Sequence, residues 1–167
     1  LSYRGFTASA LQGTPQGLAV YMNGVRVNEA FGDTVNWDLI PTNAIGRADL
    51  WSSNPIFGLN ALGGAVSLQM KNGFSYQGLE TEALYGSYGR ITGSAQYGAQ
   101  YGNFGVYMAA QGMDDKGWRF QSPSNIGRFY GDLGWKNDET ELHFFTSTAR
   151  NHFGVIGPTP VELLARD

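Results

Sequence analysis

The sequence contains no cysteine among its 167 residues. This absence excludes a disulfide framework, a thiolate nucleophile and any cysteine-based metal site. Charged residues are also scarce: they make up 15% of the chain, against about a quarter in typical soluble domains. The net charge of −3 and the pI near 5.3 argue against a nucleic-acid partner, because the phosphates of DNA and RNA favour a basic surface.

Long apolar runs are missing as well. No stretch reaches the roughly 18 apolar residues that indicate a transmembrane helix. A strand of a transmembrane barrel needs only about 10 residues of alternating polarity, so the missing helix does not exclude a membrane location.

Glycine and aromatic residues are abundant instead, with 24 glycines, 9 tyrosines and 10 phenylalanines. Aromatic side chains pack well on pleated sheets, and glycine supplies the backbone geometry of tight turns. This composition favours β-structure over a helical bundle.

Residues 1–73 have the texture of a compact mixed domain. The apolar run 18–22 is followed by Asn-Gly at 23–24, which is a strong hairpin signal. Residues 42–47 follow a proline and predict a short helical turn. Strands before and after this turn make the expected class of the first part mixed α/β.

Residues 74–167 alternate with a period of two. Tyr97 and Tyr101, for example, fall on one face of a strand and Gln96 and Gln100 on the other. Five segments show this alternation: residues 79–85, 91–101, 104–111, 127–136 and 141–150.

The connections between these segments alternate between tight turns and longer loops. Short turns at one end of a sheet, long loops at the other and strands near 10 residues are typical of outer-membrane barrels. A soluble antiparallel sandwich also alternates with a period of two, so the pattern alone leaves that alternative open.

Four motifs of the first part resemble the plug domain of TonB-dependent outer-membrane receptors. They occur in the same order as in that family, and barrel-like strands follow directly. In this chain they are residues 4–6 (Arg-Gly-Phe), 20–25 (Val-Tyr-Met-Asn-Gly-Val), 44–50 (Ala-Ile-Gly-Arg-Ala-Asp-Leu) and 60–68 (Asn-Ala-Leu-Gly-Gly-Ala-Val-Ser-Leu). Residues 51–58 keep the proline and glycine of the family's turn but lack its Arg-Gly pair.

The resemblance implies a mixed α/β plug domain in residues 1–73, with its N-terminal part missing. It implies that residues 74–167 form the first five or so antiparallel transmembrane strands of an incomplete plugged barrel of about 22 strands. The implied location is the bacterial outer membrane. The implied function is active uptake of a scarce nutrient, such as an iron–siderophore complex, cobalamin or a carbohydrate.

The resemblance also implies partners. Uptake is energised through TonB, which would bind a segment upstream of Leu1, and the strands would contact outer-membrane lipid. Neither a cofactor nor a metal is expected, nor is enzymatic activity. His143 and His152 lack an evident third metal ligand.

Candidate ligand contacts lie in the plug loops that would face the extracellular side, residues 7–16 and 29–37. Aromatic, amide and carboxylate groups suit sugars and polar chelates. The candidates are Phe31, Asp33, Asn36, Trp37 and Gln12. Packing of Phe31 and Trp37 inside the plug is the alternative interpretation.

Contacts between plug and barrel wall are the second set of candidates. Arg4 and Arg47 would pair with lumen carboxylates such as Glu80 and Glu82, or would be solvated. Two functions from other classes remain as alternatives: a non-transporting outer-membrane barrel or adhesin, and a soluble β-rich domain that binds or acts on carbohydrates.

Overall fold

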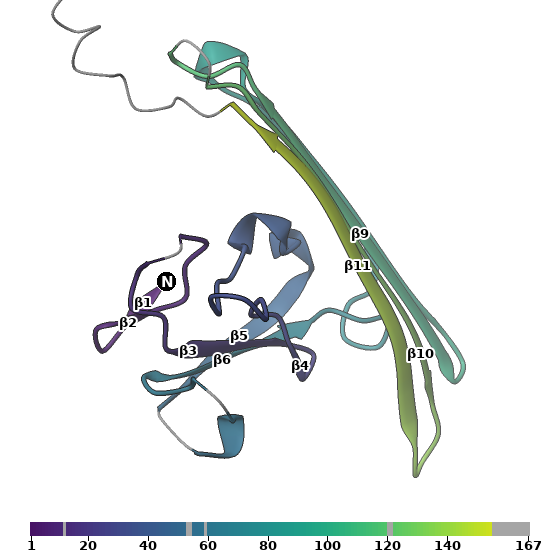
Figure 1. Cartoon of the computed structure of the whole chain (residues 1–167). Coiled ribbons are helices and arrows are strands. Elements are labelled where there is room, and N and C mark those ends of the chain that lie inside the picture. The colour runs from purple at the N-terminus through teal and green to yellow at the C-terminus, as the bar shows by residue number, and fades with distance from the viewer. Residues whose placement is uncertain (12, 53–54, 59, 120–121, 155–167) are drawn as a thin grey trace, which may run out of the picture.

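The structure is a computed structural model that describes residues 1–11, 13–52, 55–58, 60–119 and 122–154. Its strands form three sheets, of two, four and five strands (Figure 1). The four-stranded sheet lies on the concave side of the long, curved five-stranded sheet.

The first part of the chain forms the two smaller sheets. β1 (Ser2–Tyr3) and β2 (Phe6–Thr7) pair as a short hairpin. The four-stranded sheet has the order β4-β3-β6-β5. Its strands are β3 (Leu18–Met22), β4 (Val25–Arg26), β5 (Ile45–Ser52) and β6 (Gly64–Met70).

β3 and β6 run parallel and occupy the centre of this sheet, whereas the outer pairs are antiparallel. Central parallel strands are covered on both faces and therefore consist of nearly continuous apolar residues. The burial of β3 and β6 agrees: four of the five β3 residues and five of the seven β6 residues are buried.

The second part forms the antiparallel sheet with the order β11-β10-β9-β8-β7. Adjacent strands are also consecutive in the sequence, so each pair is a hairpin. The strands are β7 (Gly78–Tyr85), β8 (Ile91–Tyr101), β9 (Phe104–Asp115), β10 (Ser124–Lys136) and β11 (Glu141–Phe153).

One hydrophobic core joins the two parts. Met22, Leu68 and Met70 of the small sheet lie in the same buried cluster as Tyr107 and Tyr130 of the large sheet. Both tyrosines are fully buried, and their rings are tilted against each other at a centroid distance of 6.1 Å. The small sheet is therefore packed on the large sheet rather than merely tethered to it.

The connection between β6 and β7 lies flat against the large sheet because three strand glycines make room for it. A Cβ at Gly98 would come within 2.1 Å of the Tyr76 carbonyl oxygen, and Cβ atoms at Gly105 and Gly134 would come within 3.0 and 2.5 Å of the Phe74 ring. Glycine inside a strand often marks such a close approach.

The predicted fold class is wrong. The described residues form strands and short 3-10 turns and include no α-helix, so the first part is not a mixed α/β domain. The helical turn predicted at 42–47 shrinks to the 3-10 turn η2 (Thr42–Ala44), because β5 begins at Ile45 and pairs with β6. The remaining 3-10 turns are η1 (Trp37–Leu39), η3 (Pro55–Phe57) and η4 (Ser87–Gly89).

The barrel is not observed either. In the described part of the chain, β7 and β11 are the two edges of an open sheet and do not pair with each other. The architecture is a mostly β, sandwich-like arrangement, and the chain is a small β-rich domain. This architecture agrees better with the alternative expectation, a β-rich domain, than with a plugged barrel. No helix among the described residues has the length and apolarity needed to cross a membrane.

Candidate functional site

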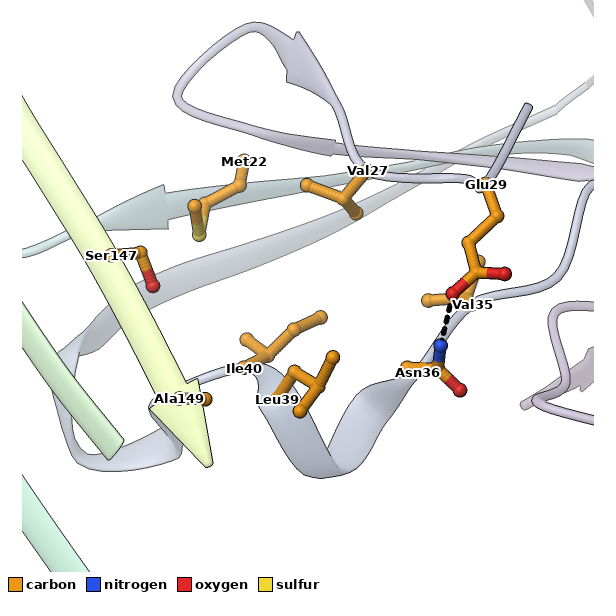
Figure 2. A pocket seen from close by; sticks show the side chains of 9 residues that line it. All are labelled: Met22, Val27, Glu29, Val35, Asn36, Leu39, Ile40, Ser147 and Ala149. Carbon is orange, nitrogen blue, oxygen red and sulfur yellow. Dashed lines mark hydrogen bonds between the residues drawn. The ribbon is translucent and has the colours of Figure 1, made fainter. Parts of the chain in front are cut away.

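A cavity of about 350 Å³ lies between the small sheet and β11. Figure 2 shows Ser147 and Ala149 of β11 on one side of it and Met22, Leu39 and Ile40 facing them. Val27, Val35, Glu29 and Asn36 complete the lining. The volume falls at the lower end of the range of small-molecule sites, about 300–1,000 Å³.

The polar side of this cavity is already engaged in hydrogen bonds. The Asn36 amide donates to Oε1 of Glu29, and the Thr34 hydroxyl donates to Oε2 of the same carboxylate at 3.2 Å. No histidine is among the residues that line the cavity with Ser147. The cavity therefore does not combine a serine nucleophile with a histidine base. Its chemistry suits reversible binding of a mainly apolar ligand with one hydrogen-bonding end.

Asn36 is the one predicted ligand residue that lines the cavity. Phe31 is 80% exposed and does not line it. Trp37 is half-buried against the core, and its indole N–H donates to the Ala8 carbonyl at 2.9 Å. Gln12 lies outside the described residues.

Asp33 is held by a network of its own. One carboxylate oxygen pairs with the Arg26 guanidinium at 2.8 Å, and the other accepts a hydrogen bond from the Asn60 amide. Its backbone has a φ of 53°, in the left-handed region, and its carbonyl accepts a hydrogen bond from Asn28. Both oxygens are therefore occupied by protein donors. A role of Phe31, Asp33, Asn36, Trp37 and Gln12 in ligand binding remains a prediction.

Among the described residues, no ion pair joins Arg4 or Arg47 to Glu80 or Glu82. Arg47 pairs with Asp49 at 2.8 Å, and the Arg4 guanidinium lies over the Tyr3 ring at 5.2 Å. Glu80 accepts hydrogen bonds from Gln96 and the Tyr76 hydroxyl, both at 3.0 Å. Partial burial, followed by the hydrogen bond to Glu80 and the charge of its carboxylate, raises the pKa of Tyr76 above its ordinary value. For Glu82, an exposed residue of β7, no partner among the described side chains is seen.

Other polar contacts join the parts instead. Lys71 donates to the Asn43 carbonyl at 3.0 Å and to Gln96 at 2.9 Å. Arg128 of β10 donates to the Asp38 carbonyl and, at 2.8 Å, to Gln111. Sequence reasoning missed these contacts because each partner is distant in the chain and lies on a face that looks merely polar.

His143 lies between two carboxylates. Its Nδ1 is 3.0 Å from Asp132 and its Nε2 is 2.8 Å from Glu141. Even so, the described residues include no group of three or more His, Asp or Glu side chains arranged to hold a metal ion.

The outward face of the five-stranded sheet is the second candidate surface. Side chains alternate along each strand: Tyr107 and Tyr130 on the inward face are buried, whereas their neighbours Met108 and Phe129 are exposed. Large exposed apolar residues of the outward face are Leu79, Tyr97, Tyr101, Phe104, Met108, Phe129, Leu133, Leu142 and Phe144. This set is called the apolar face below.

Comparisons with known proteins assign no function to the cavity or to the apolar face. No family model matches the sequence, and no curated protein matches it.

Proposed function

We propose that this chain is part of an outer-membrane receptor of the TonB-dependent class, and that its apolar face lies against lipid. The observation that carries the proposal is the exposure of that face. Leu79 is 72%, Phe144 71% and Leu133 59% exposed, and they belong to β7, β11 and β10. Soluble monomers rarely expose contiguous apolar patches larger than a few hundred Å².

The charge distribution supports a lipid environment. In the middle of the sheet the outward positions carry aliphatic, aromatic, methionine, glycine, alanine and threonine residues, and the charged outward residues Asp114 and Arg150 lie toward one end. Gln96, Arg128 and Asp132 occupy inward positions.

The receptor part of the proposal rests on the ordered motifs of residues 1–73 and on the packing between the two parts. The Asn-Gly hairpin turn at 23–24 lies beside β10, with the Asn23 amide 2.9 Å from the Tyr130 hydroxyl. A small domain packed against the inward face through a shared core and hydrogen bonds fits a protein that binds a nutrient at that face. The nutrient classes remain those given above.

Membrane association is tested by flotation of the full chain with phosphatidylcholine vesicles, without detergent. The wild-type chain should float with the vesicles. Met108→Lys, in the middle of β9, should weaken association clearly, because it puts a charge in the centre of the surface that lies against lipid. Ser94→Lys on the inward face of β8 is the matched control and should bind like the wild type. A chain that stays monomeric in buffer and does not float would contradict the proposal.

Uptake is tested by deleting the gene that encodes this chain. The mutant should grow more slowly than its parent when a ferric chelate, cobalamin or a carbohydrate is limiting, and loss of TonB should produce the same defect on the same nutrient. Normal growth on all three classes would argue against a receptor.

The cavity in Figure 2 favours a second candidate, a β-rich binding domain. The β-rich architecture fits this candidate without any further assumption. It predicts a soluble, monodisperse chain whose ligand affinity falls when Ala149→Trp fills the cavity. Binding of carbohydrates or small apolar ligands in buffer, with no vesicle association, would favour it over the receptor.

A further inference from the structure

Three basic residues gather at one end of the apolar face. Arg90 ends the turn between β7 and β8, and Lys116 and Arg119 follow β9. Ile91 pairs with Asp114, so Arg90 and Lys116 lie near each other just beyond the last paired residues. A Cβ at Gly89 would lie 3.0 Å from Cδ of Lys116, which places the lysine stem against the turn.

These cations are free to meet an external anion. All three are exposed, and none forms an ion pair with another described residue. Asp114 and Asp115 lie nearby and keep their charge, but neither forms an ion pair with the three cations: Asp115 accepts the Gly117 N–H at 2.8 Å, and Asp114 accepts from the Asn125 amide at 3.3 Å.

Exposed aromatic residues accompany the cations. Tyr85 is 80% and Trp118 70% exposed, and Tyr88 is exposed as well. The Arg119 guanidinium lies 5.4 Å from the centre of the Trp118 ring. Tyrosine and tryptophan at the border of an apolar surface are typical of the membrane interface, where their rings reach the headgroup level. The six residues Tyr85, Tyr88, Arg90, Lys116, Trp118 and Arg119 are called the basic rim.

The opposite end of the same face has the opposite charge. The turn between β10 and β11 contains Asp138 and Glu139, and Glu141 begins β11. Lys136, the nearby cation, lies over the Phe74 ring at 4.3 Å. The asymmetry means that an anionic headgroup layer is attracted to the basic rim and repelled at the other end.

We propose that the basic rim binds the phosphate groups of anionic lipid headgroups. The inference rests on the proposed membrane location of the apolar face and deepens it by naming the lipid class. The lipid's acyl chains would lie on the apolar face while its phosphate meets Arg90, Lys116 and Arg119. The aromatic side chains fix the depth at which these cations meet the headgroups.

The test compares flotation of the full chain on phosphatidylcholine vesicles with flotation on mixed phosphatidylcholine and phosphatidylglycerol vesicles. The wild-type chain should partition more strongly into the mixed vesicles. Each basic residue near an anionic surface contributes about five-fold to the partition coefficient. The triple variant Arg90→Gln, Lys116→Gln, Arg119→Gln should therefore lose roughly a hundred-fold of the preference for anionic vesicles and bind neutral vesicles as before. Lys136→Gln is the control at the opposite end and should keep the preference.

The outcomes separate the two proposals. If the chain binds neither kind of vesicle, the membrane location fails and this inference fails with it. If the chain binds both equally, or the triple variant keeps the preference, only the basic rim is refuted. Inorganic phosphate is the last arm: if it releases the chain from mixed vesicles where sodium chloride of equal ionic strength does not, the rim is a site for free phosphate and the lipid assignment is overturned.

Discussion

The side-chain amide of Asn23 donates a hydrogen bond of 2.9 Å to the hydroxyl of Tyr130, 107 positions away in the sequence. The same asparagine accepts the Met70 N–H at 2.9 Å and has a φ of 48° at the tip of the β3–β4 hairpin. One residue thus shapes the hairpin turn and ties it to β6 and to β10. Asn23 of the small sheet binds the Tyr130 hydroxyl, while the Tyr130 ring packs in the shared core. This contact therefore fixes the position of the small sheet relative to the large sheet.

Asn23→Ala should therefore destabilise the fold by about 2–4 kcal/mol, because it removes two hydrogen bonds and replaces asparagine, which tolerates the left-handed conformation, by alanine, which does not. Asn23→Gly keeps the conformational freedom and should cost roughly 1 kcal/mol less. Urea unfolding followed by circular dichroism measures the difference. Tyr130→Phe removes only the hydroxyl and should cost about 1–2 kcal/mol.

Tyr85→Phe provides the control for Tyr130→Phe. Its hydroxyl is exposed, so the substitution should change stability by less than about 0.5 kcal/mol. The double variant Asn23→Gly, Tyr130→Phe should lose less than the sum of the single losses. Strict additivity would mean that the two residues do not act as a pair.

Gly98 provides a second prediction, on the contact between the β6–β7 connection and the large sheet. A Cβ at Gly98 would meet the Tyr76 backbone at 2.1 Å, whereas Gly127 of β10 has nothing within 4 Å. Gly98→Ala should displace the connection and cost more than about 2 kcal/mol in the free energy of unfolding. Gly127→Ala should be close to neutral. Equal stability of the two variants would disprove the packing role of Gly98.

The strands of the second part were the most predictable feature. β8 runs from Ile91 to Tyr101, as its alternation predicts, and the Gly102–Asn103 turn starts β9 at Phe104. A period of two is a local property of the chain, and so is turn chemistry. Neither depends on what the sheet contacts, and for that reason neither predicts whether the sheet closes on itself. The barrel expectation went beyond what such signals contain.

Long-range contacts were not predictable in the same way. In the sequence, three glycines of the large sheet look like residues that form turns or weaken strands. In the structure they leave space for Phe74 and Tyr76 to lie against the sheet; they are Gly98, Gly105 and Gly134. Residues 42–47 follow Pro41, which favours a helix start, but Thr42, Asn43 and Gly46 are poor helix formers. Pairing of Ile45 with Met70 of β6 leaves only the 3-10 turn η2. Trp37 reads as a ligand contact and is held by Ala8. In each case a tertiary contact outweighs a local preference.

Lys71 supplies a third prediction, because it joins Asn43 of the small part to Gln96 of the large sheet. Lys71→Met keeps the apolar stem but removes both hydrogen bonds and the contact of the ammonium with the Tyr76 ring. The loss should be about 2–4 kcal/mol, since Gln96 is buried. Lys136→Met is the matched control. Its ammonium lies over the Phe74 ring, and losing this half-buried contact should cost about 0.5–2 kcal/mol. If Lys136→Met lost more unfolding free energy than Lys71→Met, Lys71 would not be the residue that links the two parts.

A substitution at Asp33 distinguishes a structural role of its carboxylate from a role in ligand binding. Its carboxylate is bound by Arg26 and Asn60, and the Arg26 and Asp33 side chains are only 29% and 20% exposed. Asp33→Ala would leave the partly buried guanidinium unpaired and should destabilise the fold by about 2–4 kcal/mol. Asp49→Ala breaks the Arg47 pair, in which the arginine side chain is 67% exposed, and should cost less than about 1 kcal/mol. Thermal unfolding of both variants gives the comparison. If Asp33→Ala is as stable as the wild type, the carboxylate is not needed to hold this loop, and its assignment to ligand binding gains support. If Asp33→Ala is destabilised, a loss of ligand binding in that variant is explained by the damaged fold and says nothing about a contact between Asp33 and the ligand.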